Sequence, residues 1–202
     1  MKHEEDIRKA GDWEIIHALH IGDKEVVFGE NTIGPAAERY MCAYCRSNEL
    51  FQEYCECVGG DDYLEIMQIY VERINGQIEA VKAEMAGITV QTTPISAKQC
   101  FPNDISKNID GLIVAIRADV LRREYRTVQS QLVLVDGGFG ASANSRGSAV
   151  FGYNLYSGKH ARYERRDVLG EVMPEHIPAW AFEKAAQFRE RQKMMKRQEP
   201  ER

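Results

Sequence analysis

Four of the five cysteines of this chain lie within sixteen residues, in the segment CAYCRSNELFQEYCEC. Cys42 and Cys45 form a CxxC pair, and Cys55 and Cys57 form a CxC pair. Structural zinc is held by four such ligands in a tetrahedron, and a close pair on each of two adjacent strands can supply them. If residues 50–58 pair back on the segment before them, the two pairs meet. The sequence therefore predicts a structural zinc site formed by these four cysteines.

Other arrangements of the thiols remain open. Cys100 can replace one of the four, with His160, His176 or an aspartate as a further ligand. The thiols can instead be buried without a ligand, since free cysteine is among the most buried residue types. Redox chemistry is less favoured because no thioredoxin-like βαβ pattern surrounds the CxxC pair. The paired HxE and PCxxC motifs of the zinc deaminases are not complete, because Met41 and not proline precedes the CxxC pair, so we expect no catalytic zinc of that class.

Most of the expected strands follow one another without a helix between them. Alternating or short apolar segments predict strands at residues 13–21, 24–29, 38–45, 112–117, 132–135, 149–156 and 161–166. Residues 50–58 fit either a strand or a short helix. Gly22-Asp23 and Ser157-Gly158 suit the turns of two hairpins. Because the strands mostly succeed one another directly, we predict a mainly antiparallel sheet and the α+β class.

One long central helix is predicted after residue 60. Asp61 or Asp62 can cap its N-terminus. Its apolar side chains recur at intervals of three and four residues and predict one buried stripe, made of Leu64, Met67, Val71, Ile74, Ile78 and Val81. We expect the helix to run to about Met85, with Gly87 ending it. A second helix, at the C-terminus, is predicted from Pro178 to about residue 197.

The charge of the chain changes sign along its length. Residues 1–86 carry 18 acidic and 8 basic side chains, whereas residues 87–202 carry 13 acidic and 18 basic ones. We expect a single α+β domain over residues 1–202, composed of a flexible segment at 1–12, an acidic hairpin-plus-helix half at 13–87, a basic and mostly β half at 88–182, and a basic helical tail at 183–202. Such a distribution can orient a charged partner, although both halves can equally be solvated surface.

Several classes of protein do not fit the sequence. No apolar run approaches the roughly 20 residues of a membrane span. The start, MKHEEDIRKAGDWE, lacks the apolar core of a secretory signal, so we expect a cytoplasmic, reducing setting. The histidines are scattered, and no serine or cysteine nucleophile motif has a fitting base. We therefore expect a protein that is not an enzyme.

A glycine-rich segment, GGFGASANSRG, spans residues 137–147. Glycine-rich loops can hold phosphates through backbone N–H groups, which would suit an enzyme acting on a phosphorylated small molecule. This segment, however, matches neither the GxxxxGK[ST] motif nor a dinucleotide fingerprint. The simpler expectation is that residues 137–147 form a tight structural loop. We also expect a longer loop at residues 88–111.

Basic and aromatic residues are interleaved after this loop. They include Arg146, Arg162, Tyr163, Arg165 and Arg166. Basic and aromatic side chains on neighbouring strands can bind phosphates and stack bases, so the hairpin is a candidate nucleic-acid surface. It also suits a protein-binding surface, where tyrosine and arginine are favoured anchors, or a plain salt-bridged sheet face.

Three parts of the sequence are similar to a known family. They are the segments GDKEVVFG and RYMCAYCRSNELF and the stretch from LVLVDGGFG to MPEHIPAWA. The chain resembles, over about residues 13–182, an uncharacterised family of small proteins from conjugative and other mobile elements of gut Firmicutes. No activity comes with that family, so the resemblance implies a genomic setting. Small accessory proteins of such elements include anti-CRISPR proteins, which block a type II CRISPR effector nuclease.

Together these observations lead to two hypotheses. The first is a non-enzymatic, zinc-stabilised inhibitor that binds a host CRISPR effector nuclease, whose nucleic-acid channel is positively charged. Its partner-binding residues would be the acids of the central helix, Asp61, Asp62, Glu65 and Glu72. The alternative is a nucleic-acid-binding accessory factor of a conjugative element that uses the basic and aromatic hairpin. The overall acidic balance counts against this alternative.

Overall fold

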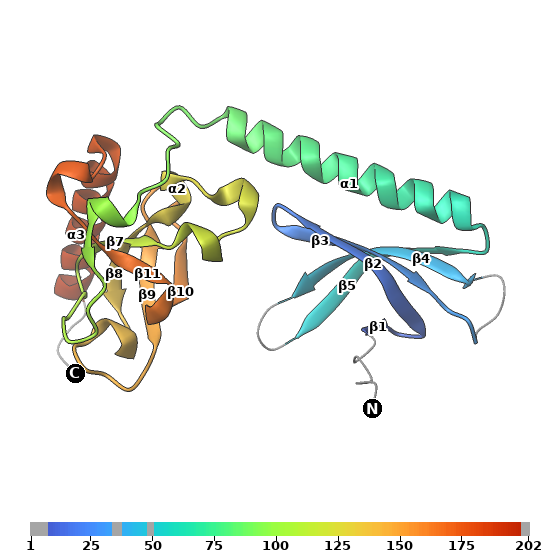
Figure 1. Ribbon diagram of the computed structural model, residues 1–202, viewed down its shortest axis with the longest axis horizontal. Helices are drawn as coiled ribbons and strands as arrows, with labels where there is room; N and C mark the ends of the chain where they lie inside the picture. The colour runs from blue at the N-terminus through green and yellow to red at the C-terminus, as the bar shows by residue number, and fades with distance from the viewer. Residues whose placement is uncertain (1–7, 34–37, 48–50, 199–202) are drawn as a thin grey trace. The chain divides into compact units, whose positions relative to one another are not determined.

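The computed structural model describes residues 8–33, 38–47 and 51–198. The chain divides into two compact units, one ending at residue 89 and the other beginning at residue 90. Each unit contains an antiparallel sheet (Figure 1). The sequence predicts one domain whose acidic half ends at residue 87, and the boundary between the two units lies next to that point. The predicted α+β class is confirmed, with two sheets in place of one.

The first unit begins with a five-stranded sheet in which neighbours in sequence are neighbours in space. Its order is β1-β2-β3-β4-β5, and every pairing is antiparallel. The strands are β1 (Lys9–Ala10), β2 (Trp13–Ile21), β3 (Lys24–Glu30), β4 (Tyr40–Ser47) and β5 (Gln52–Gly60). The ambiguous segment 50–58 is therefore a strand where it is described. Of the predicted flexible segment, residues 1–7 lie outside the described residues, and the remainder includes β1.

Helix α1 (Tyr63–Ala86) begins and ends where the sequence predicted. The Asp62 carboxylate accepts hydrogen bonds from the backbone N–H groups of Leu64 and Glu65, at 2.8 and 3.2 Å. The Gly87 N–H donates to carbonyls of the last turn and closes the helix. An aspartate at the N-cap both satisfies free N–H groups and lies at the positive end of the helix dipole.

Helix α1 packs on one face of the first sheet (Figure 1). Its buried side chains Ile66 and Tyr70 meet Phe28 and Cys42 of the sheet. The predicted apolar stripe is partly correct, because Met67 and Ile74 pack against this core, whereas Leu64 and Val71 are 73% and 47% exposed. The opposite face of the sheet has a smaller core of its own, formed by Ala10, Val27, Met41, Ala43 and Cys45 with Trp13, Ile15 and Tyr54 against them.

The second unit has a six-stranded antiparallel sheet in the order β10-β9-β8-β7-β11-β6. Its strands are β6 (Cys100–Pro102), β7 (Ile113–Ile116), β8 (Leu132–Gly137), β9 (Ala149–Asn154), β10 (His160–Glu164) and β11 (Val168–Val172). Two α-helices belong to it, α2 (Val128–Gln131) and α3 (Ala179–Gln198). Short 3₁₀ helices lie at Ala97–Gln99, Ala118–Val120, Arg123–Tyr125, Phe139–Ala141, Arg165–Asp167 and Pro174–His176.

The sheet of the second unit has a core on each face. Helix α3 covers one face, where Ala181 and Ala185 pack against Leu134 and neighbouring apolar residues. Val114, Val133, Val150 and Val168 lie in the core of the other face. The expected loop at 88–111 is only partly irregular, because β6 within it forms an edge of the sheet. The tail predicted at 183–202 continues α3 to residue 198, and the last four residues lie outside the described part.

Candidate functional site

The two cysteines of the CxxC pair lie on opposite faces of the first sheet. Cys42 is in the core beneath α1, beside Phe28 and Ile66, whereas Cys45 is in the core of the opposite face. The reason is the strand itself, since residues three apart on a strand point to opposite sides. The CxxC pair is therefore part of β4 and does not form a metal-binding knuckle.

The CxC pair is also divided between the two faces. Cys55 pairs across the strands with Tyr44, which lies on the α1 face. Cys57 instead lines a pocket with Met41 of the opposite core. Between them, Glu56 has a positive φ of 53° and lies at a β-bulge, which reverses the direction of the next side chain. Each face of the sheet thus holds two of the four thiols.

This arrangement does not fit the predicted zinc site. Four ligands about 2.3 Å from one ion cannot converge from both sides of a sheet. Within the described residues, no group of three or more histidine, cysteine, aspartate or glutamate side chains is placed to hold a metal ion. The cysteines are free thiols, and burial raises the pKa of Cys42 and Cys45 despite nearby arginines. The alternative reading of buried, unliganded thiols describes Cys42 and Cys45, which are 0% and 1% exposed.

The further ligands considered for the metal site have other surroundings. Cys100 lies in the α3-side core of the second unit, and burial raises its pKa to about 11. The His160 ring nitrogen Nε2 lies 2.9 and 3.0 Å from the two carboxylate oxygens of Asp136. The rings of Phe151 and Tyr153 flank this imidazole. His160 is therefore hydrogen-bonded and packed against aromatic rings within the second unit.

A chelator test distinguishes the zinc site predicted from the sequence from the divided cysteines of the structure. We expect millimolar EDTA to leave the thermal unfolding temperature of the protein unchanged to within about 1 °C, because two thiols on each face of the sheet do not complete a structural zinc site whose binding would stabilise the fold. Cys57→Ser, at an exposed position, is expected to change stability by less than about 0.5 kcal/mol. One zinc per chain by elemental analysis, lost on replacing any of the four cysteines, would contradict this result.

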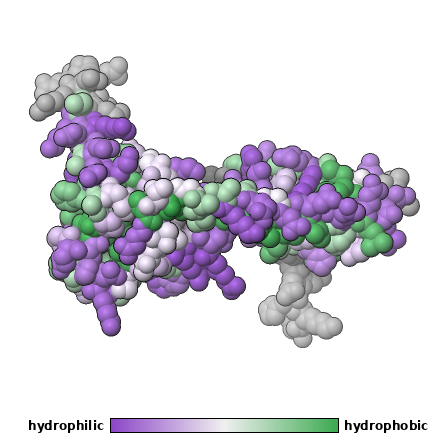
Figure 2. All heavy atoms as spheres, turned by 90° about the horizontal axis from the view of Figure 1, so that it is seen from above, coloured by the Kyte–Doolittle hydropathy of each residue, from purple (hydrophilic) through white to green (hydrophobic). Residues whose placement is uncertain are grey.

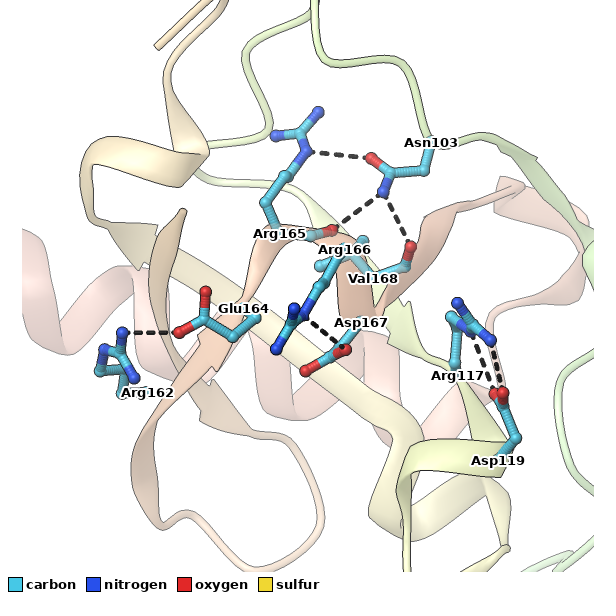
Figure 3. Close-up of polar contacts among 9 residues, drawn as sticks. All are labelled: Asn103, Arg117, Asp119, Arg162, Glu164, Arg165, Arg166, Asp167 and Val168. Atoms are coloured by element: carbon cyan, nitrogen blue, oxygen red, sulfur yellow. Dashed lines mark hydrogen bonds and ion pairs between the residues drawn. The ribbon is translucent and has the colours of Figure 1, made fainter. Parts of the chain in front are cut away.

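Arg165, a predicted nucleic-acid residue, is buried in the second unit and is only 7% exposed. Its guanidinium donates to the carbonyls of Asp104, Lys107 and Gly140 and to the Asn103 side chain, at 2.7, 3.2, 3.0 and 2.9 Å. Asn103 in turn donates to the carbonyls of Arg165 and Val168 (Figure 3). The arginine therefore joins the 103–107 segment to the glycine-rich loop, and four of its five N–H groups donate to these protein acceptors. This assignment is a correction of the prediction.

The other arginines of the hairpin lie beside carboxylates (Figure 3). Arg162 pairs with Glu164 at 2.6 Å, and Arg166 lies 3.9 Å from Asp167. Figure 3 also shows Arg117 paired with Asp119 nearby. Each positive charge is thereby offset locally, which weakens the attraction for a phosphate backbone. The salt-bridged sheet face considered from the sequence matches this arrangement.

Tyr163 and Arg146 complete the predicted nucleic-acid set. Tyr163 packs against the core that contains Val133 and Val150, and burial raises its pKa. Its ring is therefore not free to stack on a base, which corrects that prediction. Arg146 is exposed on the glycine-rich loop. The five residues do not form one basic and aromatic surface.

The glycine-rich loop is folded tightly on its own neighbours. A Cβ atom on Gly140 would lie 2.3 Å from the carbonyl oxygen of Ser148, and one on Gly138 would lie 2.3 Å from that of Ala149. The loop also accepts a hydrogen bond from the Ile109 N–H through the Ala141 carbonyl. The glycines thus permit close approach of two backbone segments, which matches the simpler expectation of a tight structural loop.

The acids predicted to bind a partner are exposed on α1 and its cap. Asp61, Asp62, Glu65 and Glu72 all face solvent. Glu72 accepts a hydrogen bond from Gln68 one turn earlier, at 2.9 Å, and Asp62 is the helix cap. Large apolar side chains are exposed among these acids, with Leu64 at 73% and Val71 at 47%. Figure 2, seen from above, shows hydrophobic residues interspersed with hydrophilic ones over this part of the surface. We call Leu64, Glu65, Gln68, Val71 and Glu72 the α1 outer surface.

Sequence reasoning did not identify a pocket of about 390 Å³ in the first unit. Ala10, Gly11, Trp13, Glu38, Met41, Tyr54, Cys57, Val58 and Gly59 line it. A polar clamp lies next to it, in which Arg8 donates to Glu25 at 2.6 and 2.9 Å and to the Tyr54 hydroxyl at 2.9 Å. The pocket residues come from four strands, so no local pattern marks them. The exception is Trp13, a large aromatic residue at a strand end.

The clamp makes the first unit sensitive to acid. The hydrogen bond from Arg8 holds the pKa of Glu25 below its ordinary value of 4.5. The resulting stabilisation is fully present above pH 4.5 and is lost as the pH falls through the lowered pKa. We expect the stability of the wild type to fall more steeply than that of Glu25→Gln between pH 5 and about pH 2, in urea unfolding followed at Trp13. Parallel pH profiles would contradict the clamp.

The described helices include none that is both long and apolar enough to cross a membrane. The geometry thus offers two candidate sites in the first unit, the α1 outer surface and the pocket, whereas the four cysteines and the five basic and aromatic residues are not brought together. No protein-family model, no curated protein and no solved structure matches this chain.

Proposed function

We propose that this chain is a non-enzymatic binding protein whose α1 outer surface contacts a positively charged surface of another protein. The observation that carries the proposal is the combination of Glu65 and Glu72 with the exposed side chains Leu64 and Val71 on one helix. Protein interfaces combine apolar contacts with complementary charge, and exposed apolar groups within a charged face are typical of interaction sites.

The helix is well placed to present such a surface rigidly. Ile66 and Tyr70 anchor it to the sheet from the opposite side. Arg73 binds the carbonyls of Cys42 and Glu56 at 3.2 and 2.6 Å and stacks on the Tyr44 ring. A helix face fixed by packing and hydrogen bonds loses little conformational freedom on binding, which favours affinity.

The nature of the partner rests on charge and on the resemblance to mobile-element proteins. Residues 1–86 carry ten more acidic than basic side chains, so the unit suits a strongly basic partner. Nucleic-acid channels of CRISPR effector nucleases are strongly basic because they hold a guide and its target. We therefore propose that the partner is a type II CRISPR effector nuclease of the host and that the protein inhibits it by covering such a channel.

The alternative function, nucleic-acid binding through the hairpin of the second unit, has less support. Arg165 is committed to backbone carbonyls, and Tyr163 is packed in the core. Arg162 and Arg166 each have an acidic neighbour. The carboxylates oppose the approach of phosphates at the positions where attraction is required.

Charge reversal on α1 tests the proposed function. We expect Glu65→Lys combined with Glu72→Lys to weaken inhibition of DNA cleavage by a type II effector nuclease at least about tenfold, because both carboxylates would then repel the basic surface. Leu64→Ala is expected to weaken it by about threefold to tenfold through lost apolar contact. The measurement is the concentration for half-inhibition of cleavage, with the fold checked by circular dichroism.

A matched control variant makes the same change in net charge on helix α3. Glu183→Lys combined with Glu190→Lys alters two exposed acids of α3 and is expected to leave inhibition unchanged. Equal weakening by both double variants would mean that only net charge matters and would contradict a site on α1.

A further inference from the structure

The pocket of the first unit has a distinctive set of walls. Trp13, Tyr54 and Met41 supply aromatic and apolar surface. Its volume of about 390 Å³ lies within the range of small-ligand and side-chain pockets. The pocket is on the face of the sheet opposite α1, since Met41 and Tyr54 belong to that core. It is therefore separate from the α1 outer surface.

The charged side chain in the pocket lining is acidic. Among the described residues that line the pocket, Glu38 carries the one charged side chain, and it is exposed. The Trp13 indole N–H donates to the backbone carbonyl of Glu38 at 3.0 Å, so the indole and this acidic residue are held together. An aromatic wall with a carboxylate at its edge favours a cation on an apolar stem.

The protein already packs a cation on one of these walls. The guanidinium carbon of Arg8 lies 5.6 Å from the centre of the Tyr54 ring. Its charge is balanced by the two oxygens of Glu25, so it does not offset the charge of Glu38. The chemistry of the site is thus compatible with an incoming positive group.

Residues of both terminal strands of the sheet line the pocket. Cys57, Val58 and Gly59 belong to β5, and Ala10 belongs to β1. These are the two terminal strands in the order of the sheet, and within the described residues β5 pairs with β4 alone. An extended polypeptide can lie along such an edge while one of its side chains enters an adjacent pocket.

We infer that this pocket receives a lysine or arginine side chain of an extended polypeptide bound at the edge of β5. The aliphatic stem contacts Met41 and the Tyr54 ring, and the cation lies between the Trp13 ring and the Glu38 carboxylate. The recognition is independent of the proposed function, because it uses other residues on the other face of the sheet.

The test uses the full-length protein and two capped pentapeptides that differ at the central residue, lysine or its neutral analogue norleucine. The chain has two tryptophans, so the two indole N–H signals in a ¹H–¹⁵N spectrum report Trp13 and, as an internal reference, Trp180. We expect saturable shifts of the Trp13 signal, with the lysine peptide binding about fivefold more tightly than the norleucine peptide.

The variant Glu38→Gln should remove that preference, and Glu53→Gln, an exposed acid of β5 outside the pocket, should keep it. Butylammonium should bind more weakly than the lysine peptide. Equal affinity for lysine and norleucine, or no shift of the Trp13 signal with either, would overturn the cation site. Equal binding of butylammonium and peptide would overturn the polypeptide as the source. The double variant Glu65→Lys and Glu72→Lys should bind the peptide normally, which separates this result from the proposed function.

Discussion

Replacing Arg165 by alanine is expected to lower the free energy of unfolding of the second unit by about 3–5 kcal/mol. The side chain is buried and serves four acceptors on two segments, including the Gly140 carbonyl and the Asn103 amide oxygen. Its removal leaves these acceptors unsatisfied and opens a cavity in their midst. Urea unfolding followed by Trp180 fluorescence, in a background with Trp13→Phe, measures the change in this unit.

The neighbouring arginine provides the control for this prediction. The side chain of Arg166 is 84% exposed, so Arg166→Ala is expected to change stability by less than about 0.5 kcal/mol. Arg165→Lys should remain strongly destabilising, because a single ammonium group cannot reproduce the fork of donors. If Arg165→Ala folds with wild-type stability and instead loses affinity for nucleic acid, the side chain serves a ligand and the structural role is wrong.

The glycine-rich loop gives the second large expected effect. Gly138 has a φ of +100°, and a Cβ atom there would lie 2.3 Å from the backbone oxygen of Ala149. Gly138→Ala is therefore expected to destabilise the second unit by about 2–4 kcal/mol, from backbone strain and from displacement of β9. Thermal unfolding monitored at Trp180 detects this change.

The adjacent glycine separates the two causes. Gly137 also has a positive φ, of +149°, but a Cβ atom there would meet nothing within 4 Å. Gly137→Ala is expected to cost only about 1 kcal/mol, from strain alone. Equal effects of the two substitutions would exclude the close backbone contact as the reason for glycine at position 138.

Local signals in the sequence predict much of the first unit. Strand β2 has the bounds that its alternation indicated, Trp13–Ile21, and the turn at Gly22 joins it to β3. The cap of α1 follows from Asp62, whose side chain has the required acceptor. These features depend on residues close in sequence, and so periodicity and capping rules are sufficient to find them.

The cysteine and arginine side chains do not come together as the sequence predicts, for a reason that lies in the strand geometry. A spacing of two intervening residues brings side chains together at a turn, but on β4 it places Cys42 and Cys45 on opposite faces. The same period of two places Tyr163 inward and Arg162 outward on β10. Once a strand is assigned, this alternation is readable from the sequence. The burial of Arg165 is not, because its partners are about 20 to 60 residues away.

Long-range pairing explains the remaining differences. Strand β11 pairs with β6 and β7, which precede it by more than 50 residues, and its Gly170 sits against the Phe101 carbonyl. A five-residue segment interrupted by glycine gives a weak local signal. The pocket likewise collects residues from β1, β2, β4 and β5. Its walls exist only after the sheet has formed.

Direct binding of the full-length chain to a type II CRISPR effector nuclease is the measurement that tests the central claim. Calorimetric titration should be done with the guide-free nuclease, with the nuclease loaded with guide and target, and at two salt concentrations. We expect a saturable 1:1 complex with the guide-free nuclease that weakens at high salt, weakens with Glu65→Lys and Glu72→Lys, and is displaced by nucleic acid in the channel. The proposed function would be contradicted if neither form of the nuclease formed a complex. It would also be contradicted if the affinity of the complex changed neither with the α1 charges nor with occupancy of the channel.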